Sequence, residues 1–263
     1  MGAGIPPAGI VEAIDKRRRA FLWTGEETCN GGNCKVAWDE VCTLKDRDGL
    51  GVLSIRAQIS ALLSKFLTKL HSDSSAPRAC WFRRRYDWTG AQDLGDPHHL
   101  DTPAWKGIVA GLETFLSISK VTIGKGDMTA FWTDLWLGDH TLQDRFPNLF
   151  SHSTCMNANV ATALTSDFRG TVEPRLSQAT ETDLRNLAFE LSFVILCDDV
   201  PDSHWDRITN KKLSNKSVYS NSFRHMQIDE VAEKVWKSAA PLKCKIFCWL
   251  AGKRRLPTNE HRF

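Results

Sequence analysis

The sequence predicts an α+β fold that is mainly α, with helical segments, short β-hairpins and domains that are incomplete or loosely packed. Apolar residues recur at spacings of three and four in several segments, which is typical of amphipathic helices. Short apolar runs flank turn residues in two places, and no alternation of strands and helices indicates a parallel sheet. With 42% hydrophobic and 25% charged residues, the 263-residue chain has an ordinary globular composition.

Apolar periodicity predicts the helices. The clearest one runs from Ile55 to Leu70, and Ser54 is placed to cap its first turn. An earlier helix begins around Pro7, although Arg18 interrupts its apolar face. The long stem of that arginine can lie along the face while its charge reaches water or a phosphate. Further helices are predicted over residues 104–116, 182–193 and 218–226.

Turn residues predict two β-hairpins and a linker. The sequence GKGD, which begins at Gly124, separates two short apolar runs within residues 121–136. A second hairpin is predicted over residues 205–212. Residues 87–103 are polar and rich in Gly, Asp, Pro and His, so we expect a loop or linker there.

The basic residues are clustered, although the net charge of +3 is too small to indicate a nucleic-acid partner by itself. Solvated helix ends and loops explain any one basic run, whereas the four runs together, at residues 16–19, 83–85, 211–212 and 253–255, indicate a phosphate-binding surface. Lys243 falls within the apolar arc of a helix opened by Pro241, so it either snorkels to water or contacts a phosphate. The candidate residues for binding RNA or DNA are Lys16, Arg17, Arg18, Arg19, Arg83, Arg84, Arg85, Lys243, Lys245, Lys253, Arg254 and Arg255.

The amino-terminal sequence MGAGIPPAG lacks the basic and apolar segments of a signal peptide, and no apolar stretch is long enough to span a bilayer. We therefore expect an intracellular chain with no membrane partner, and the choice between nucleus and cytoplasm stays open. Its eight cysteines are then expected to be mostly reduced thiols.

The string FVILCDDV is the one that suggests catalysis, because polymerases hold two metal ions on adjacent aspartates at a hydrophobic hairpin. Leu196 stands where an aromatic residue would precede Asp198 and Asp199, and Pro201 turns the chain where a second strand should run. We interpret this stretch as a solvated acidic loop, and no catalytic residue is predicted.

Two close cysteine pairs are candidates for metal ligands. Cys29 with Cys34, and Cys244 with Cys248, lack the CxxC spacing of a tight metal-binding turn. No CxxC or HxxxH pair follows to complete four ligands. The second pair lies four residues apart on a helix beside apolar residues, so we expect buried structural thiols, and no metal site is predicted.

The sequence WKSAAPLKCKIFCWLAGKRRLPT resembles the opening of the zinc-binding domain at the end of plant LINE-type (non-LTR) retrotransposon reverse transcriptases. Its Lys243, Lys245, Phe247 and Trp249 match the family's PxKxKxFxW pattern. The blocks IDKRRRAFLWTG, KVAWDEVC and DGLGVL resemble the region just after the polymerase palm. VTIGKGDMTAFWTDLWLGDHTLQDRFPNLF resembles the family's IGxGxxxxFWxDxWLG block, and HWDRITNKKLSNKSVYSNSF resembles its short hairpin and helix.

The resemblance implies which parts of the family the chain contains. The palm aspartates would lie before the position matched by Met1, and the family's zinc ligands would lie after Phe263, so no cofactor is expected. The implied regions are a helical region after the palm (1–86), a linker (87–103), a connecting region with the FWxDxW hairpin (104–200) and the first half of a zinc-binding-like domain (201–263).

The first hypothesis is a non-catalytic fragment of a retrotransposon reverse transcriptase that binds RNA or DNA without sequence preference. The alternatives are a chain that retains RNA-directed DNA polymerase activity, and the product of a decayed element with no biochemical role. Apolar faces that lack partners would also favour self-association.

Overall fold

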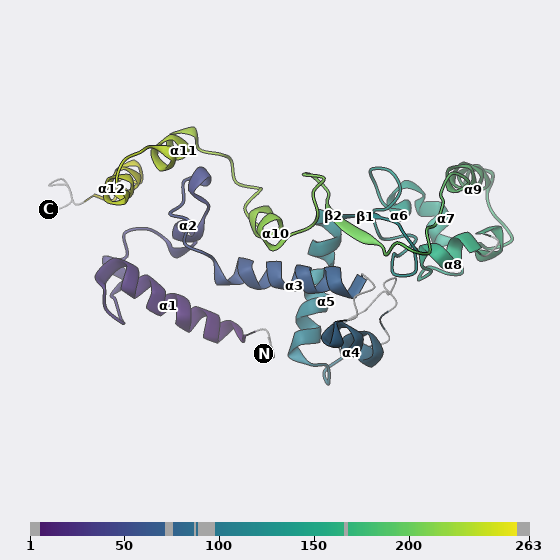
Figure 1. The fold of residues 1–263 in the computed structure, drawn as a ribbon, viewed down its shortest axis with the longest axis horizontal. Coiled ribbons are helices and arrows are strands. Elements are labelled where there is room, and N and C mark those ends of the chain that lie inside the picture. The colour runs from purple at the N-terminus through teal and green to yellow at the C-terminus, as the bar shows by residue number, and fades with distance from the viewer. Residues whose placement is uncertain (1–5, 72–75, 87, 89–97, 166–167, 257–263) are drawn as a thin grey trace. The chain divides into compact units, whose positions relative to one another are not determined.

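The computed structural model describes residues 6–71, 76–86, 88, 98–165 and 168–256 (Figure 1). Within these ranges the chain forms twelve α-helices and one two-stranded sheet, so the predicted mainly α fold with little strand is confirmed. The chain divides into two compact units. The terminal unit comprises Met1–Ala61 and Val218–Phe263, and the central unit comprises Leu62–Ser217.

The terminal unit contains four helices around one apolar cluster: α1 (Ala8–Thr24), α2 (Trp38–Cys42), α11 (Glu230–Lys237) and α12 (Leu242–Gly252). Val41 of α2 and Trp249 of α12 are buried in this cluster, and Trp23 of α1 and Trp236 of α11 pack against it. The indole nitrogen of Trp249 also donates to the carbonyl of Asp48 at 3.0 Å. Segments from both ends of the sequence therefore share one core, which apolar burial stabilises.

Most of the helices that the sequence predicts are observed. The clearest one is α3 (Ile55–His71), and the Ser54 hydroxyl accepts a hydrogen bond from the Ala57 amide, which confirms the N-cap. The helix expected near Pro7 is α1, and α12 begins directly after Pro241. The helices expected over residues 104–116 and 182–193 are α5 (Pro103–Ile118) and α9 (Gln178–Leu191). Other observed helices were not predicted, namely α2, α4 (Pro77–Tyr86), α6 (Leu142–Arg145), α7 (Pro147–Ser151), α8 (Val160–Thr165) and α11.

The helix predicted over residues 218–226 is placed too late. The observed helix, α10 (Asn215–Asn221), begins after Ser214, whose hydroxyl accepts a hydrogen bond from the Ser217 amide at 3.2 Å. Beyond Asn221 the chain continues as tight turns, such as the one closed by the Arg224 amide on the Asn221 carbonyl. The serine cap, rather than the apolar pattern, therefore sets where this helix begins.

The central unit has two apolar clusters. The first lies among α6 (Leu142–Arg145), α7 (Pro147–Ser151), α8 (Val160–Thr165) and α9, and Trp132 is almost completely buried in it. The second joins the end of α3 to α4 (Pro77–Tyr86) and α5, and includes Phe82, Trp105 and Phe115. Large aromatic side chains therefore fill both clusters.

The single sheet within the described ranges corrects the predicted hairpin over residues 121–136. Strand β1 (Ser119–Thr122) pairs antiparallel with the distant strand β2 (Ser203–Asp206), with Ser119 opposite Asp206. The hairpin prediction was wrong because GKGD does not return the chain to a second local strand. Instead, the Asp202 carboxylate beside β2 accepts hydrogen bonds from the amides of Gly124 and Gly126. The second predicted hairpin, over residues 205–212, is reduced to one bridge between Trp205 and Lys212.

The four regions implied by the family resemblance stay a prediction. Most of the expected linker, namely residues 87 and 89–97, lies outside the described residues, and α5 begins at Pro103. None of the helices in the described part of the chain is both long enough and apolar enough to cross a membrane.

Candidate nucleic-acid interface

The basic run on α1 is divided between solvent and the fold. Lys16 and Arg17 are exposed. Arg18 instead donates to the Asp15 carboxylate at 2.7 Å and to the Leu53 carbonyl at 2.6 Å, and its guanidinium lies over the Trp38 ring. Arg18 therefore holds α1 to its neighbours, and the two residues before it are the ones that a partner can reach.

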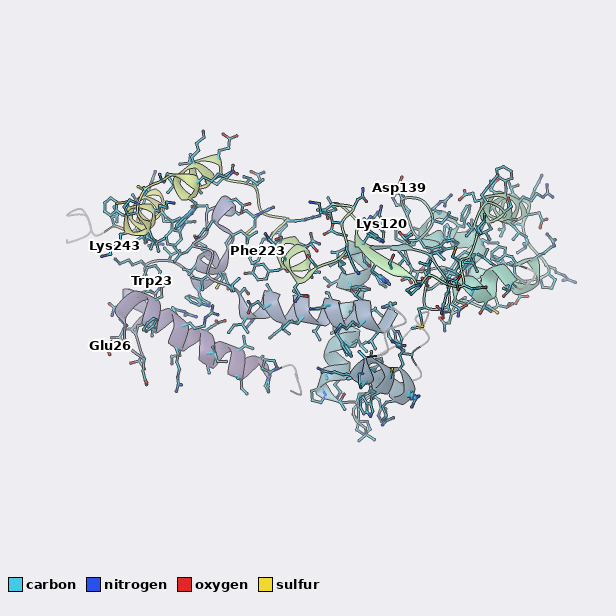
Figure 2. The ribbon with its side chains drawn as sticks, viewed as in Figure 1. Trp23, Glu26, Lys120, Asp139, Phe223 and Lys243 are labelled. Carbon is cyan, nitrogen blue, oxygen red and sulfur yellow. The ribbon has the colours of Figure 1, made fainter. Side chains whose placement is uncertain are left out.

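The basic residues of α12 divide in the same way. Lys243 is exposed in the first turn, where Figure 2 shows it, whereas the ammonium of Lys245 donates to the Trp236 carbonyl at 2.9 Å. Lys253 lies between two carboxylates, with 2.8 Å to Glu40 and 2.7 Å to Asp48. Burial alone would lower the pKa of Lys253, but these two carboxylates outweigh it and raise the pKa.

Four other candidate arginines are also exposed. Arg254 and Arg255 lie just after α12, and Arg84 and Arg85 lie on α4 in the central unit. The guanidinium of Arg83, on the same helix, donates to the Lys69 carbonyl at 3.3 Å. The last candidate, Arg19, is half-buried, and its Nε atom is buried without a hydrogen-bond partner.

Three of the exposed candidate cations on helices have an exposed aromatic residue four positions away, a spacing that sequence reasoning missed. Arg17 precedes Phe21 on α1, and Lys243 precedes Phe247 on α12; these rings are 74% and 59% exposed. On α4, Trp81 is 51% exposed and precedes Arg85. Residues four apart on a helix lie on the same face, so cation and ring are neighbours in each case. The spacing is visible in the sequence once the helices are known.

Two of these pairs belong to one folded body. Trp23, which packs against the apolar cluster of the terminal unit, lies on α1 six residues after Arg17, a distance of roughly 9 Å along the helix. Ile246, Trp249 and Leu250 of α12 belong to the same cluster. Figure 2 shows Trp23 and Lys243 toward the same end of the terminal unit. The α1 and α12 pairs therefore lie on helices that share a core.

Asp198 and Asp199 lie in an exposed turn, which the Val200 amide closes on the Cys197 carbonyl at 3.2 Å. This placement agrees with the interpretation of the stretch as an acidic loop. In the described part of the chain, no three His, Cys, Asp or Glu side chains gather into a group that could hold a metal ion.

A buried carboxylate organises the IGKGDMT segment. Asp202 accepts hydrogen bonds from Gly124 N at 2.8 Å, Gly126 N at 2.9 Å and the Thr129 hydroxyl at 2.6 Å. A Cβ atom on Gly124 would lie 1.8 Å from the Val200 carbonyl oxygen, so only glycine fits there. The glycine-rich motif thus has a structural role, and the sequence offers no local signal for its partner 78 residues away.

Three further buried acids and bases have shifted pKa values. Burial raises the pKa of Asp134 to about 7, although its carboxylate accepts a hydrogen bond from the Ala130 amide at 2.7 Å. Burial lowers the pKa of His71 to about 4 and that of His204 well below its usual value. Both imidazoles are therefore neutral at pH 7, and their ring centroids lie 5.0 Å apart.

The prediction that Cys244 and Cys248 are buried is wrong, because both are exposed. The helix α12 buries Trp249 and Leu250, and the two cysteines lie on the opposite, solvent-facing side. Cys29 and Cys34 are half-buried, and Cys42 is the one cysteine of the described residues that is fully buried. Burial raises the pKa of the Cys42 thiol to about 11.

One segment of the chain is similar in sequence to a known protein family. Residues 213–262 match the family described as zinc-binding in reverse transcriptase. Over 269 aligned positions, which include 97% of this chain, it is 27% identical to an Arabidopsis thaliana protein named "Putative ribonuclease H protein". The chain spans 42% of the length of that relative. No solved structure matches significantly.

The described residues of the matched segment do not fit a zinc site. Cys244 and Cys248 are exposed, lie one turn apart on α12 and would supply two of the four ligands that a structural zinc requires. Within residues 213–256 no further ligand-bearing side chain completes a group with them. The likeness to the zinc-binding family therefore concerns the sequence of this segment rather than a set of zinc ligands among its described residues.

Proposed function

We propose that this chain is the part of a LINE-type (non-LTR) retrotransposon reverse transcriptase that follows the polymerase palm. In this proposal it binds single-stranded RNA or DNA without base-specific readout and catalyses no reaction. The match of residues 213–262 to the zinc-binding family and the 27% identity to the plant relative support the ancestry. The proposed binding rests on one observation, the exposed cation–aromatic pairs on α1 and α12.

A cation beside an exposed ring suits a single strand. The guanidinium of Arg17 or the ammonium of Lys243 can neutralise a phosphate, and the ring of Phe21 or Phe247 can stack on the adjacent base. Bases paired in a duplex do not offer their faces in this way. Every base has a stacking face, so this mode of binding carries little sequence preference.

The test is fluorescence anisotropy with a labelled oligouridine, a labelled oligothymidine and a DNA duplex. The variant Arg17→Gln with Lys243→Gln should bind both single strands more weakly and should show a smaller dependence on salt. The variant Phe21→Ala with Phe247→Ala keeps every charge. It should bind single strands at least tenfold more weakly, because stacking contributes about 1 to 3 kcal/mol per base, while duplex binding should change little.

The matched control removes the same charge from other exposed sites. Lys211 lies in the turn after β2, and Lys234 lies on α11. Both are exposed, and no described residue three or four positions from either one is an exposed aromatic. The variant Lys211→Gln with Lys234→Gln should retain most of the affinity. If this control weakens binding as much as the Arg17 and Lys243 variant does, the cation–aromatic pairs are not the site. If the affinity of the unmodified chain does not change with salt, the phosphate model is wrong.

A further inference from the structure

Cys29 and Cys34 lie together in the loop between α1 and α2 of the terminal unit. Both are thiols, and their Sγ atoms are 3.5 Å apart in an S–H···S contact. A disulfide bond requires an Sγ–Sγ distance of about 2.05 Å, so closing the bond needs a movement of about 1.5 Å. Rotation of the two side chains with a small shift of the loop can supply that movement.

A short turn brings the two cysteines together. The segment between them is the 3₁₀ turn Gly31–Asn33, in which Asn33 N donates to the Asn30 carbonyl at 3.0 Å and Cys34 N donates to the Gly31 carbonyl at 3.1 Å. Apart from the local backbone and the adjoining residues of each glycine, no heavy atom of the described residues lies within 4 Å of the position where a Cβ atom would stand on Gly31 or Gly32. The loop therefore has open space in which to adjust as the sulfur atoms approach.

The surroundings of Cys34 disfavour its thiolate form. Partial burial and the hydrogen bond with Cys29 raise the pKa of the Cys34 thiol, and the nearby Arg19 guanidinium opposes this shift without overcoming it. The Cys34 thiolate is therefore a minor form at neutral pH. Because the thiolate is the attacking species, Cys34 attacks efficiently only when the Cys29 sulfur already carries a good leaving group in a mixed disulfide.

We propose that Cys29 and Cys34 form a modification site that a low-molecular-weight disulfide, such as glutathione disulfide, converts into an intramolecular disulfide. One cysteine thiolate first attacks the external disulfide, forms a mixed disulfide and releases one external thiol. The other cysteine then attacks the protein sulfur of the mixed disulfide, and the second external thiol leaves. The two cysteines lose two protons and two electrons, and the external disulfide gains them as two thiols.

The chain contains its own control in Cys244 and Cys248. Both are exposed, so they are more accessible than the loop pair. Residues four apart on an α-helix have Cβ atoms about 5 to 6 Å apart, whereas a disulfide needs about 3.5 to 4.5 Å. These two cysteines can each take a mixed disulfide, but the helix prevents them from closing onto each other.

The experiment treats the whole reduced chain with graded ratios of glutathione to glutathione disulfide, blocks the remaining thiols and maps peptides by mass spectrometry without reduction. The expected product is a link between Cys29 and Cys34 with the loss of two hydrogens and no retained glutathione. Cys244 and Cys248 should carry glutathione without a link. The variant Cys34→Ser should stop at the first step and retain one glutathione on Cys29, and its circular dichroism spectrum shows whether it is folded.

Two results would overturn the proposal. One is that Cys29 and Cys34 each retain glutathione, or stay free thiols, under conditions that modify Cys244 and Cys248. The other is a link between Cys244 and Cys248 that forms as readily as the link in the loop. If Cys34→Ser fails to fold, Cys34→Ala provides the same arrest of the second step.

Discussion

Replacing Asp202 by alanine tests whether one buried carboxylate holds the glycine-rich segment in place. Asp202 is 3% exposed and accepts three hydrogen bonds, from the amides of Gly124 and Gly126 and from the hydroxyl of Thr129. A hydrogen bond to a charged group contributes about 1.5 to 3 kcal/mol, and the substitution also leaves two buried amides without an acceptor. We expect Asp202→Ala to lower the free energy of unfolding by about 3 to 5 kcal/mol.

Urea denaturation followed by tryptophan fluorescence measures this loss, and hydrogen exchange over residues 123–130 shows where it arises. The amides of Gly124 and Gly126 should lose protection. The control is Asp199→Ala, which removes a carboxylate from an exposed turn nearby in sequence and should change the stability by less than about 0.5 kcal/mol. A loss below about 1 kcal/mol for Asp202→Ala would refute the assigned role of the carboxylate.

Two further predictions concern pH. His71 has a pKa of about 4 in the folded state against 6.5 in the unfolded state, so the free energy of unfolding falls by about 3 kcal/mol as pH falls from about 6.5 to about 4. In His71→Gln, the free energy of unfolding measured in urea should depend less on pH across this window. The same pH dependence in the variant and the unmodified chain would contradict the assignment. Asp134 has a folded pKa of about 7 against 3.8, so its contribution is lost as pH rises from about 4 to above 7. Asp134→Asn should therefore gain stability relative to the unmodified chain between pH 5 and pH 8, and an equal stability difference at both pH values would refute this.

The sequence predicts the helices well where local signals agree. In α3, apolar residues at spacings of three and four and the cap at Ser54 both indicate the same helix, and both are confirmed. In α10 the cap at Ser214 and the apolar pattern disagree, and the cap decides. The existence of these two helices was therefore predictable, whereas their boundaries depended on which local contact is stronger.

The pairing of β1 with β2 could not be predicted from local pattern. The glycines around Lys125 are typical of a hairpin turn, but Gly124 lies against the Val200 carbonyl and donates to Asp202, far along the chain. A contact between segments so distant in sequence leaves no periodic signature in either. The same reasoning explains α12, where most positions are apolar or cysteine and only the packing of Trp249 and Leu250 decides which side is buried.

The sequence predicts which basic residues are candidates for the interface, but it does not predict which of them are exposed. The basic clusters were visible in the sequence, but the fold uses Arg18, Lys245 and Lys253 for internal hydrogen bonds and ion pairs. Lysines and arginines look alike in a sequence. Only their hydrogen-bond and ion-pair partners in the fold show which of them have a structural role and which are free to contact a nucleic acid. The aromatic neighbours Phe21 and Phe247 gain meaning only when the helices place them on the same faces as Arg17 and Lys243.

The most direct test of the proposed function is the affinity of the whole chain for an oligouridine as the salt concentration rises from about 50 to about 200 mM. The candidate cations that are exposed on the terminal unit are Lys16, Arg17, Lys243, Arg254 and Arg255. Contact with about two to five of them predicts a slope of log affinity against log salt of about −1.4 to −3.5 for a single strand. A slope near zero, or an affinity for duplex equal to that for the single strand, would contradict the account.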